Sequence, residues 1–377
     1  MNLFKKLMAV TLVLVMVFTL NACHGKDETA MTINGIKITS AMYLNALLEA
    51  DLAARNKVDE EKAAADKASG TSSDAETATA QEETDYFAQT IDGQKYVDYV
   101  KENAMDACKE YAFYQKLADD KKISLTDDEK AQATSTAEAY WNYYGYSSYY
   151  EPNGISLDTY KKAMIYSYYA NAYFLKIYGE GGEKAVDKAT IASTLKDKFA
   201  LVYTLNKAYG EEDTDDTKSA AKSQFNDFVA RLKKGEDFKK ISDEFNGTTG
   251  EANVDVSQMD NEDAAKDSLA TIIGDSDTTY ASEDFSTVKE MKKGEVKLLD
   301  TDTGLTIYVK LDITEDPYYL KMLNDSILSL LKQEEFDKFI TGETDKLTVK
   351  ENKFALNNLS VKKIKYPSAD STGATAQ

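Results

Sequence analysis

An apolar helical stripe near the C-terminus, with no partner close to it in the sequence, constrains the fold of this chain most strongly. Asp316 places a cap before Pro317, which takes the first position of a long helix. The apolar residues of that helix recur at helical spacing: Leu320, Leu323, Ile327, Leu330, Leu331, Phe336, Phe339 and Ile340. Residues 199–311 carry strands at both ends with helices between them, which predicts a self-contained α+β domain of roughly 120 residues. The stripe must then pack against helices N-terminal to that domain, so we predict a mostly α-helical, discontinuous domain with an α+β domain inserted into it.

The segment before residue 199 has the pattern of a small hairpin followed by several helices. Residues 32–38 alternate apolar and polar side chains around Asn34-Gly35, and Thr39 or Ser40 can cap the helix behind them. Apolar spacing and glycine stops predict further helices at about 93–121, 126–145, 156–179 and 185–198.

Two positions in these helices have a specific structural interpretation. Thr126 is followed three residues later by Glu129, the spacing of a capping box at a helix N-terminus. Cys108 lies on the apolar face of the helix at 93–121, with no histidine near it in sequence to activate the thiol. We therefore expect Cys108 to be a small core residue.

Two stretches contain too few apolar residues to offset the conformational entropy that folding would cost. Residues 60–85 contain Ala, Ser, Thr, Asp, Glu and Gln with no aliphatic residue larger than alanine, and residues 367–377 are a polar tail. We predict a disordered insertion at 60–85 and a disordered tail at 367–377.

The first 22 residues have the pattern of a secretory signal peptide. Lys5 and Lys6 precede an apolar run at 7–20, which is too short to span a membrane comfortably. The small residue before Cys23 resembles the lipobox of bacterial lipoproteins, which implies lipidation of Cys23 and an extracytoplasmic protein anchored to the outer face of the bacterial cell membrane. An ordinary signal peptide with an incidental cysteine is the alternative.

The composition excludes several classes of site. One histidine and two cysteines among 377 residues cannot build a histidine or thiolate metal site, and we predict no metal, no cofactor and no catalytic residue. The net charge of −20 repels nucleic acid, so nucleic acid is not an expected partner.

The order of these parts resembles the SurA and PrsA group of extracytoplasmic foldases. Three segments carry the resemblance besides the lipobox: residues 33–39, 123–129 and 155–161. The resemblance implies a helical, SurA N-terminal-like chaperone domain interrupted by a parvulin-type peptidyl-prolyl isomerase domain. The boundaries it implies are 23–195 for the first chaperone segment, 196–316 for the parvulin-like domain and 317–366 for the helix and strand that complete the chaperone domain.

The parvulin-like part departs from the pattern of active isomerases. Residues 232–238, 291–296 and 304–311 resemble a parvulin helix start, closing turn and last strand. The family pattern places one histidine on the first strand and another on the last. This chain has Val202 and Tyr203 in the first place and Thr306 in the second. Tyr203 and Thr306 would line a degenerate isomerase pocket, with weak or absent turnover as the expectation.

Tyrosine is concentrated between residues 140 and 178. Tyr146, Tyr149 and Tyr150 fall in an expected loop, and together with Tyr143 and Tyr144 they are candidate contacts for unfolded client chains, because tyrosine combines a large apolar ring with a polar tip. For residues on helical spacing the competing interpretation is a helical core built from tyrosine: Tyr160, Tyr168 and Tyr173. A stacking platform for glycans is a third possibility.

These features lead to one functional hypothesis and two alternatives. The first is a membrane-anchored extracytoplasmic chaperone that binds unfolded or partly folded secreted polypeptides, with a parvulin-like domain that is catalytically inactive. The second is an active prolyl isomerase with an atypical site, and the third is a solute-binding lipoprotein. The sequence predicts no oligomeric state.

Overall fold

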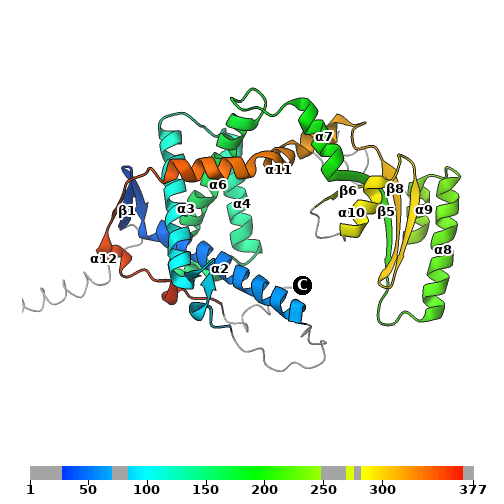
Figure 1. The fold of residues 1–377 in the computed structure, drawn as a ribbon, viewed down its shortest axis with the longest axis horizontal. Coiled ribbons are helices and arrows are strands. Elements are labelled where there is room, and N and C mark those ends of the chain that lie inside the picture. Colours follow the sequence, from blue (N-terminus) through cyan, green and yellow to red (C-terminus); the bar gives the residue numbers. More distant parts are fainter. Residues whose placement is uncertain (1–27, 70–83, 248–268, 276–281, 368–377) are drawn as a thin grey trace, which may run out of the picture. The chain divides into compact units, whose positions relative to one another are not determined.

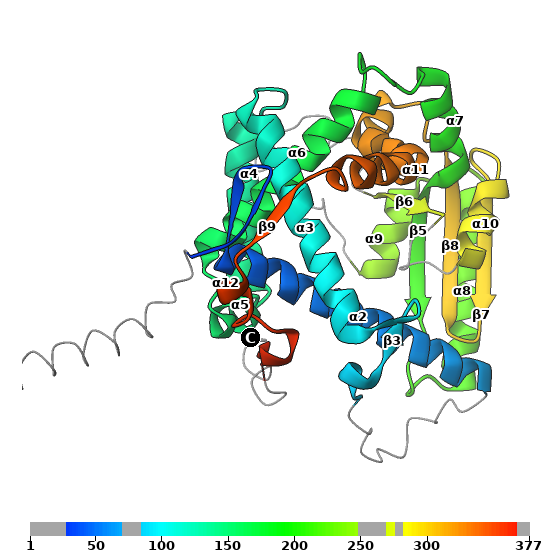
Figure 2. The same cartoon turned by 60° about the vertical axis from the view of Figure 1, so that its left-hand side comes forward.

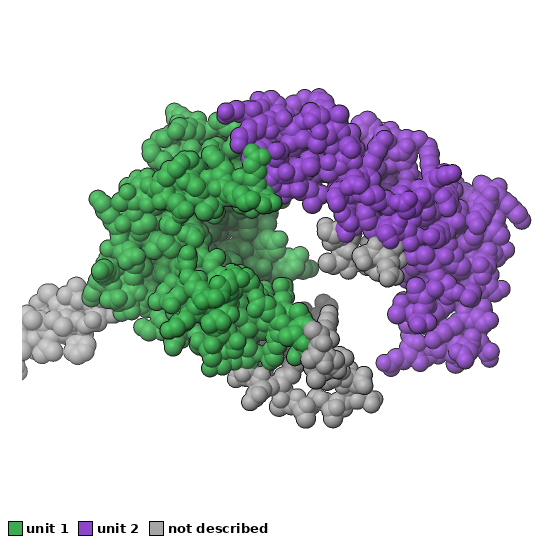
Figure 3. All heavy atoms as spheres, viewed as in Figure 1, with its two compact units in different colours: residues 1–177, 334–377 green, residues 178–333 purple. Residues whose placement is uncertain are grey.

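The computed structural model describes residues 28–69, 84–247, 269–275 and 282–367. The signal peptide at 1–22, Cys23, the central part of the expected insertion and nearly all of the C-terminal tail lie outside these ranges. The chain divides into two compact units, shown in different colours in Figure 3: residues 1–177 with 334–377, and residues 178–333. The fold is mostly helical and discontinuous with an α+β portion, as the sequence predicts. No helix in the described ranges is long and apolar enough to cross a membrane.

The helical unit is built from helices of very different length and from short strands. Its α-helices are α2 (Ser40–Ser69), α3 (Tyr96–Asp119), α4 (Asp127–Tyr143), α5 (Ser147–Tyr150), most of α6 (Leu157–Tyr178), the last part of α11 (Pro317–Thr344) and α12 (Lys353–Leu356). Its 3-10 helices are η1 (Tyr86–Ala88), η2 (Glu151–Asn153) and η4 (Val361–Lys363). Its strands are β1 (Thr29–Ile33), β2 (Ile36–Thr39), β3 (Thr90–Ile91), β4 (Gln94–Lys95) and β9 (Val349–Glu351).

A three-stranded sheet joins the two ends of the helical unit. Asn34 and Gly35 have φ angles of 46° and 88°, so the predicted Asn-Gly turn connects β1 to β2. The other edge of β1 pairs with β9 (Figure 2). In this pairing Met31 is opposite Glu351. The C-terminal segment therefore supplies a strand to the sheet that the N-terminal hairpin begins.

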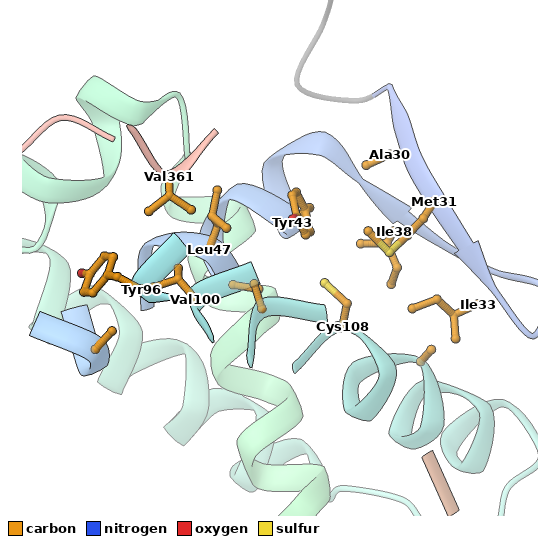
Figure 4. Packing of buried hydrophobic residues seen from close by; sticks show 14 of the residues in the cluster. Ala30, Met31, Ile33, Ile38, Tyr43, Leu47, Tyr96, Val100, Cys108 and Val361 are labelled. Atoms are coloured by element: carbon orange, nitrogen blue, oxygen red, sulfur yellow. The ribbon is translucent and has the colours of Figure 1, made fainter. Parts of the chain in front are cut away.

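The main core of the helical unit lies between this sheet and helices α2 and α3. Figure 4 shows the Cys108 side chain among the buried hydrophobic residues of this core, near Ile38 and Tyr43. Burial raises the pKa of the Cys108 thiol to about 12. The prediction that Cys108 is a core residue is confirmed.

The capping box predicted at the N-terminus of α4 is confirmed. The Thr126 side chain accepts from the Glu129 backbone N–H at 3.2 Å, and the Glu129 carboxylate accepts from the Thr126 N–H at 2.7 Å.

The predicted start of the disordered insertion at residue 60 is wrong. Helix α2 continues to Ser69 instead of stopping at residue 60. Alanine and charged residues propagate a helix that the core has already nucleated, even where no apolar side chain is buried.

The α+β unit contains a four-stranded antiparallel sheet covered by helices. Its elements are α7 (Lys188–Lys198), β5 (Phe199–Ala208), α8 (Asp215–Lys233), α9 (Phe238–Asn246), β6 (Ala270–Gly274), α10 (Ser282–Glu290), β7 (Val296–Thr301), β8 (Gly304–Leu311) and the first part of α11. The strand order is β6-β5-β8-β7. Helices α8 and α9 pack on one face and α10 on the other (Figure 1). Strand β6 lies in a stretch whose polar composition gave no strand prediction.

Candidate functional site

Exposed aromatic rings gather at the C-terminal end of α4. Tyr143 is 90% exposed and Tyr144 is 66% exposed, although a tyrosine ring is largely apolar. The helix continues just far enough past the buried Trp141 to present both rings to solvent. Two large rings that gain nothing from the protein's own core are available for contact with another molecule.

Two further tyrosines extend this surface, and we call the four together the tyrosine edge: Tyr140, Tyr143, Tyr144 and Tyr146. The Tyr140 ring lies 5.3 Å from that of Tyr144 and stacks on that of Tyr146, with centroids 5.5 Å apart and planes 19° apart. Tyr140 was not among the predicted contacts. Its spacing of three and four residues from Tyr143 and Tyr144 is the signal that places it on their side of the helix.

A buried aromatic cluster packs against the tyrosine edge on its core side. Trp141, Tyr150 and Tyr160 are buried, and the ring of Tyr146 stacks on that of Tyr150 with centroids 5.9 Å apart. This contact fixes the half-buried Tyr146 against the core, so the edge is held by packed rings rather than by a free loop.

The expectation that Tyr150 contacts clients is wrong. Tyr150 is only 1% exposed, and its hydroxyl donates to the Glu49 carboxylate on α2. The segment expected to be a loop is instead the short helix α5 followed by η2. A phenol becomes a core residue when an acceptor satisfies its hydroxyl, and this acceptor lies 101 residues away in the sequence.

The remaining tyrosines of this region are divided between core and partly exposed positions. Tyr149 is half-buried, and its ring meets that of Tyr366 edge-on at 6.4 Å. Tyr160 is a core residue, as the helical spacing predicts. Tyr168 and Tyr173 on the same helix are half-buried.

The α+β unit does not bring together the two residues expected to line a degenerate isomerase pocket. Tyr203 is opposite Val309 in the β5–β8 register, on the face covered by α8 and α9, and its ring stacks on Phe238 at 4.8 Å. Thr306 is opposite Asn206 and accepts a 3.0 Å hydrogen bond from its side chain amide. Successive residues of a strand point to opposite faces, so Thr306 lies on the other side of the sheet. The expectation of one pocket containing both residues is therefore wrong.

Within the described ranges, no group of three or more His, Cys, Asp or Glu residues is placed to hold a metal ion. The side chains of the tyrosine edge offer apolar rings and hydrogen-bonding hydroxyls.

Comparison with known proteins gives similarity at the level of solved structures. No protein-family model and no curated protein matches the chain. The foldase protein PrsA from Streptococcus pneumoniae str. Canada MDR_19A is 12% identical, with 67% of this chain and 87% of that chain covered and a TM-score of 0.38. PrsA from Bacillus subtilis is 15% identical, with 66% and 86% covered and a TM-score of 0.32.

A third similar structure is the foldase protein PrsA from Lactococcus lactis, which is 15% identical, with 70% of this chain and 87% of that chain covered and a TM-score of 0.36. These structures belong to the group that the sequence motifs resemble.

Proposed function

We propose that this protein is an extracytoplasmic chaperone that holds unfolded or partly folded secreted polypeptides. The observation that carries the proposal is the exposure of Tyr143 and Tyr144 on a surface whose neighbouring rings are fixed by the core. Rigid, amphipathic rings bind varied partners at a small cost in side-chain entropy. A surface of this kind suits client chains that all expose apolar segments but have no sequence motif in common.

The proposal includes a lipid anchor at Cys23. Its support is the sequence alone, in the apolar run at 7–20 and the small residue before Cys23. Removal of the signal peptide takes away Lys5 and Lys6, so the net charge of the anchored protein would be −22, which would keep the folded body away from an anionic membrane. Mass spectrometry of the membrane fraction tests this part, and an N-terminal cysteine without acyl chains would contradict it.

The proposal also holds that the α+β unit is not an active isomerase. The separation of Tyr203 and Thr306 on opposite faces of the sheet supports this, as does the lack of histidine at both positions. Turnover of Xaa-Pro peptides by the full chain in a protease-coupled assay would overturn this part. A solute-binding protein of the repeated βαβ type finds no support, because the paired strands in the described ranges are antiparallel.

Replacing both exposed rings, as Tyr143→Ser with Tyr144→Ser, should weaken the suppression of client aggregation. Each interfacial ring of this kind contributes about 1 kcal/mol or more, so the loss of both should raise the concentration needed for half-suppression about thirtyfold or more. Light scattering of a chemically denatured client diluted into the chaperone measures this.

Two controls separate contact from folding. Phe354→Ser removes a different exposed ring of the helical unit and should leave suppression unchanged. The fluorescence of Trp141, which is buried next to the tyrosine edge, should be native in both variants. Unchanged suppression by the double variant would refute the tyrosine edge as the contact surface.

A further inference from the structure

A pocket of about 360 Å³ lies in the helical unit among α2, α3 and α6. This volume is within the range of small-ligand sites, about 300–1,000 Å³. Part of its wall is apolar and includes Ile38, Met42, Ala46 and Ala163. The tyrosine edge contributes no residue to it, so the pocket is a separate candidate site.

Two carboxylates stand in the wall of this pocket, Glu49 on α2 and Glu110 on α3. Both side chains are accessible, yet the surrounding protein raises the pKa of each carboxyl above its usual value. The charges of Asp337 and Asp106 raise the pKa of Glu110 further. Among the described residues, no lysine or arginine pairs with either carboxylate. Both acids therefore line the same pocket without a cationic partner among the described residues, and Glu49 accepts a hydrogen bond from the Tyr150 hydroxyl.

A third acceptor of the pocket wall has no donor. Asn45 is only 7% exposed, and its side chain Oδ1 has no hydrogen-bond partner. A buried amide oxygen left without a donor costs free energy that most proteins avoid. Asn45 and Glu49 are four residues apart on α2, so they lie on the same side of that helix.

We propose that this pocket binds an alkylammonium cation, with the apolar stem against the pocket wall and the ammonium group near Asn45, Glu49 and Glu110. An ammonium carries three N–H donors and no acceptor, which complements the Asn45 Oδ1 and the two carboxylates. Those acceptors come from two helices rather than from one plane, so they suit the rotatable ammonium better than the flat fork of a guanidinium.

A lysine side chain of a client polypeptide is the source that fits the proposed function, and the inference rests on that function in this respect only. Lysine joins an apolar stem of four carbons to a charged head, and it would neutralise part of a chain whose net charge is −20. A free alkylamine shares the same chemistry and is distinguished by experiment.

Calorimetry with the full chain compares three probes. The first is a short capped peptide with one lysine between leucines, the second has norleucine in place of that lysine, and the third is n-butylammonium chloride. Binding of the lysine peptide about tenfold tighter than the norleucine peptide is the expected result, since a charge-assisted hydrogen bond at a partly open site has about that effect. Binding of n-butylammonium as tight as that of the lysine peptide would assign the pocket to free amines instead, and equal binding of the two peptides would overturn the inference.

Neutral variants locate the effect in the pocket. Glu49→Gln and Glu110→Gln should each weaken binding of the lysine peptide about tenfold, while Glu61→Gln removes the same charge from the exposed part of α2 and should leave it unchanged. A carboxylate with a purely structural role would lower the melting temperature on replacement. Glu110→Gln should leave the melting temperature unchanged or higher, because the pKa of the Glu110 carboxyl is raised. Glu49 also accepts from the Tyr150 hydroxyl, a bond that the amide oxygen of a glutamine can still accept.

The two proposals fail in different ways. If the chain suppresses no client aggregation but still prefers the lysine peptide through Glu49 and Glu110, the proposed function fails and the pocket stands. If the chain suppresses aggregation but binds both peptides alike, or if the Gln variants keep the full preference for the lysine peptide, only the pocket assignment fails.

Discussion

Replacing Asp51 with alanine should lower the free energy of unfolding of the helical unit by about 3–5 kcal/mol, the cost of leaving one partner of a buried charged network alone. Asp51 is 0% exposed on α2. Its carboxylate accepts from Arg55 Nε at 3.0 Å, from the Tyr96 hydroxyl at 2.8 Å and from the Tyr366 hydroxyl. The network thus connects α2 to α3 and to the C-terminal segment.

The variant would leave several groups without their partner at once. The Tyr96 and Tyr366 hydroxyls would lose the carboxylate to which they donate. The Arg55 guanidinium would lose its ion pair and keep its contacts with the rings of Tyr86 and Tyr366, at 4.4 and 4.2 Å from the ring centroids. Such ring contacts contribute about 0.5–2 kcal/mol and do not replace a buried ion pair.

Urea unfolding followed by tryptophan fluorescence measures this loss selectively. The sequence has a single tryptophan, Trp141, and it is buried in the helical unit. Asp59→Ala is the matched control on the same helix, because Asp59 is exposed and accepts only from the Tyr86 hydroxyl among the side chain bonds of the described part. We expect Asp59→Ala to change stability by less than about 1 kcal/mol. Equal effects of the two variants would contradict a buried network.

Gly304→Ala should destabilise the α+β unit by about 1–3 kcal/mol. Gly304 begins β8 with a φ of 156°, and a Cβ built there would lie 2.5 Å from the Lys207 carbonyl oxygen and 3.0 Å from Ala208 Cα on β5. The obstacle is the backbone of the neighbouring strand, which cannot move without breaking the ladder.

Circular dichroism during thermal unfolding measures the effect of Gly304→Ala. Gly342→Ala is the control, because Gly342 lies in α11, has no atom within 4 Å of an added Cβ and should gain up to about 1 kcal/mol in helix propensity. A Gly304→Ala protein as stable as wild type would show that the β5–β8 edge tolerates a side chain.

The features that sequence predicted well are those fixed by neighbouring residues. The Asn34-Gly35 turn and the capping box of Thr126 and Glu129 each depend on a few consecutive positions. The discontinuous helical fold followed from one unpartnered stripe at 317–340, because an apolar face has to be buried somewhere.

The features that sequence missed depend on distant partners or on register. Burial of Tyr150 requires Glu49, and nothing near Tyr150 in the sequence indicates that acceptor. The faces of Tyr203 and Thr306 follow from the β5–β8 register, which two separate strand patterns leave open. Asp51 did leave a signal: it lies on the apolar stripe of its helix, four residues after Leu47, where a lone carboxylate indicates a buried network.

Photo-crosslinking from the tyrosine edge tests the central claim most directly. A benzophenone-bearing amino acid in place of Tyr143 should crosslink to a denatured client during its dilution into the full chain. The same group in place of Phe354, another exposed ring of the helical unit, serves as the reference position. The proposed chaperone predicts adducts at position 143 well above those at position 354. Equal yields at the two positions, or no adduct at position 143 while aggregation is still suppressed, would contradict it.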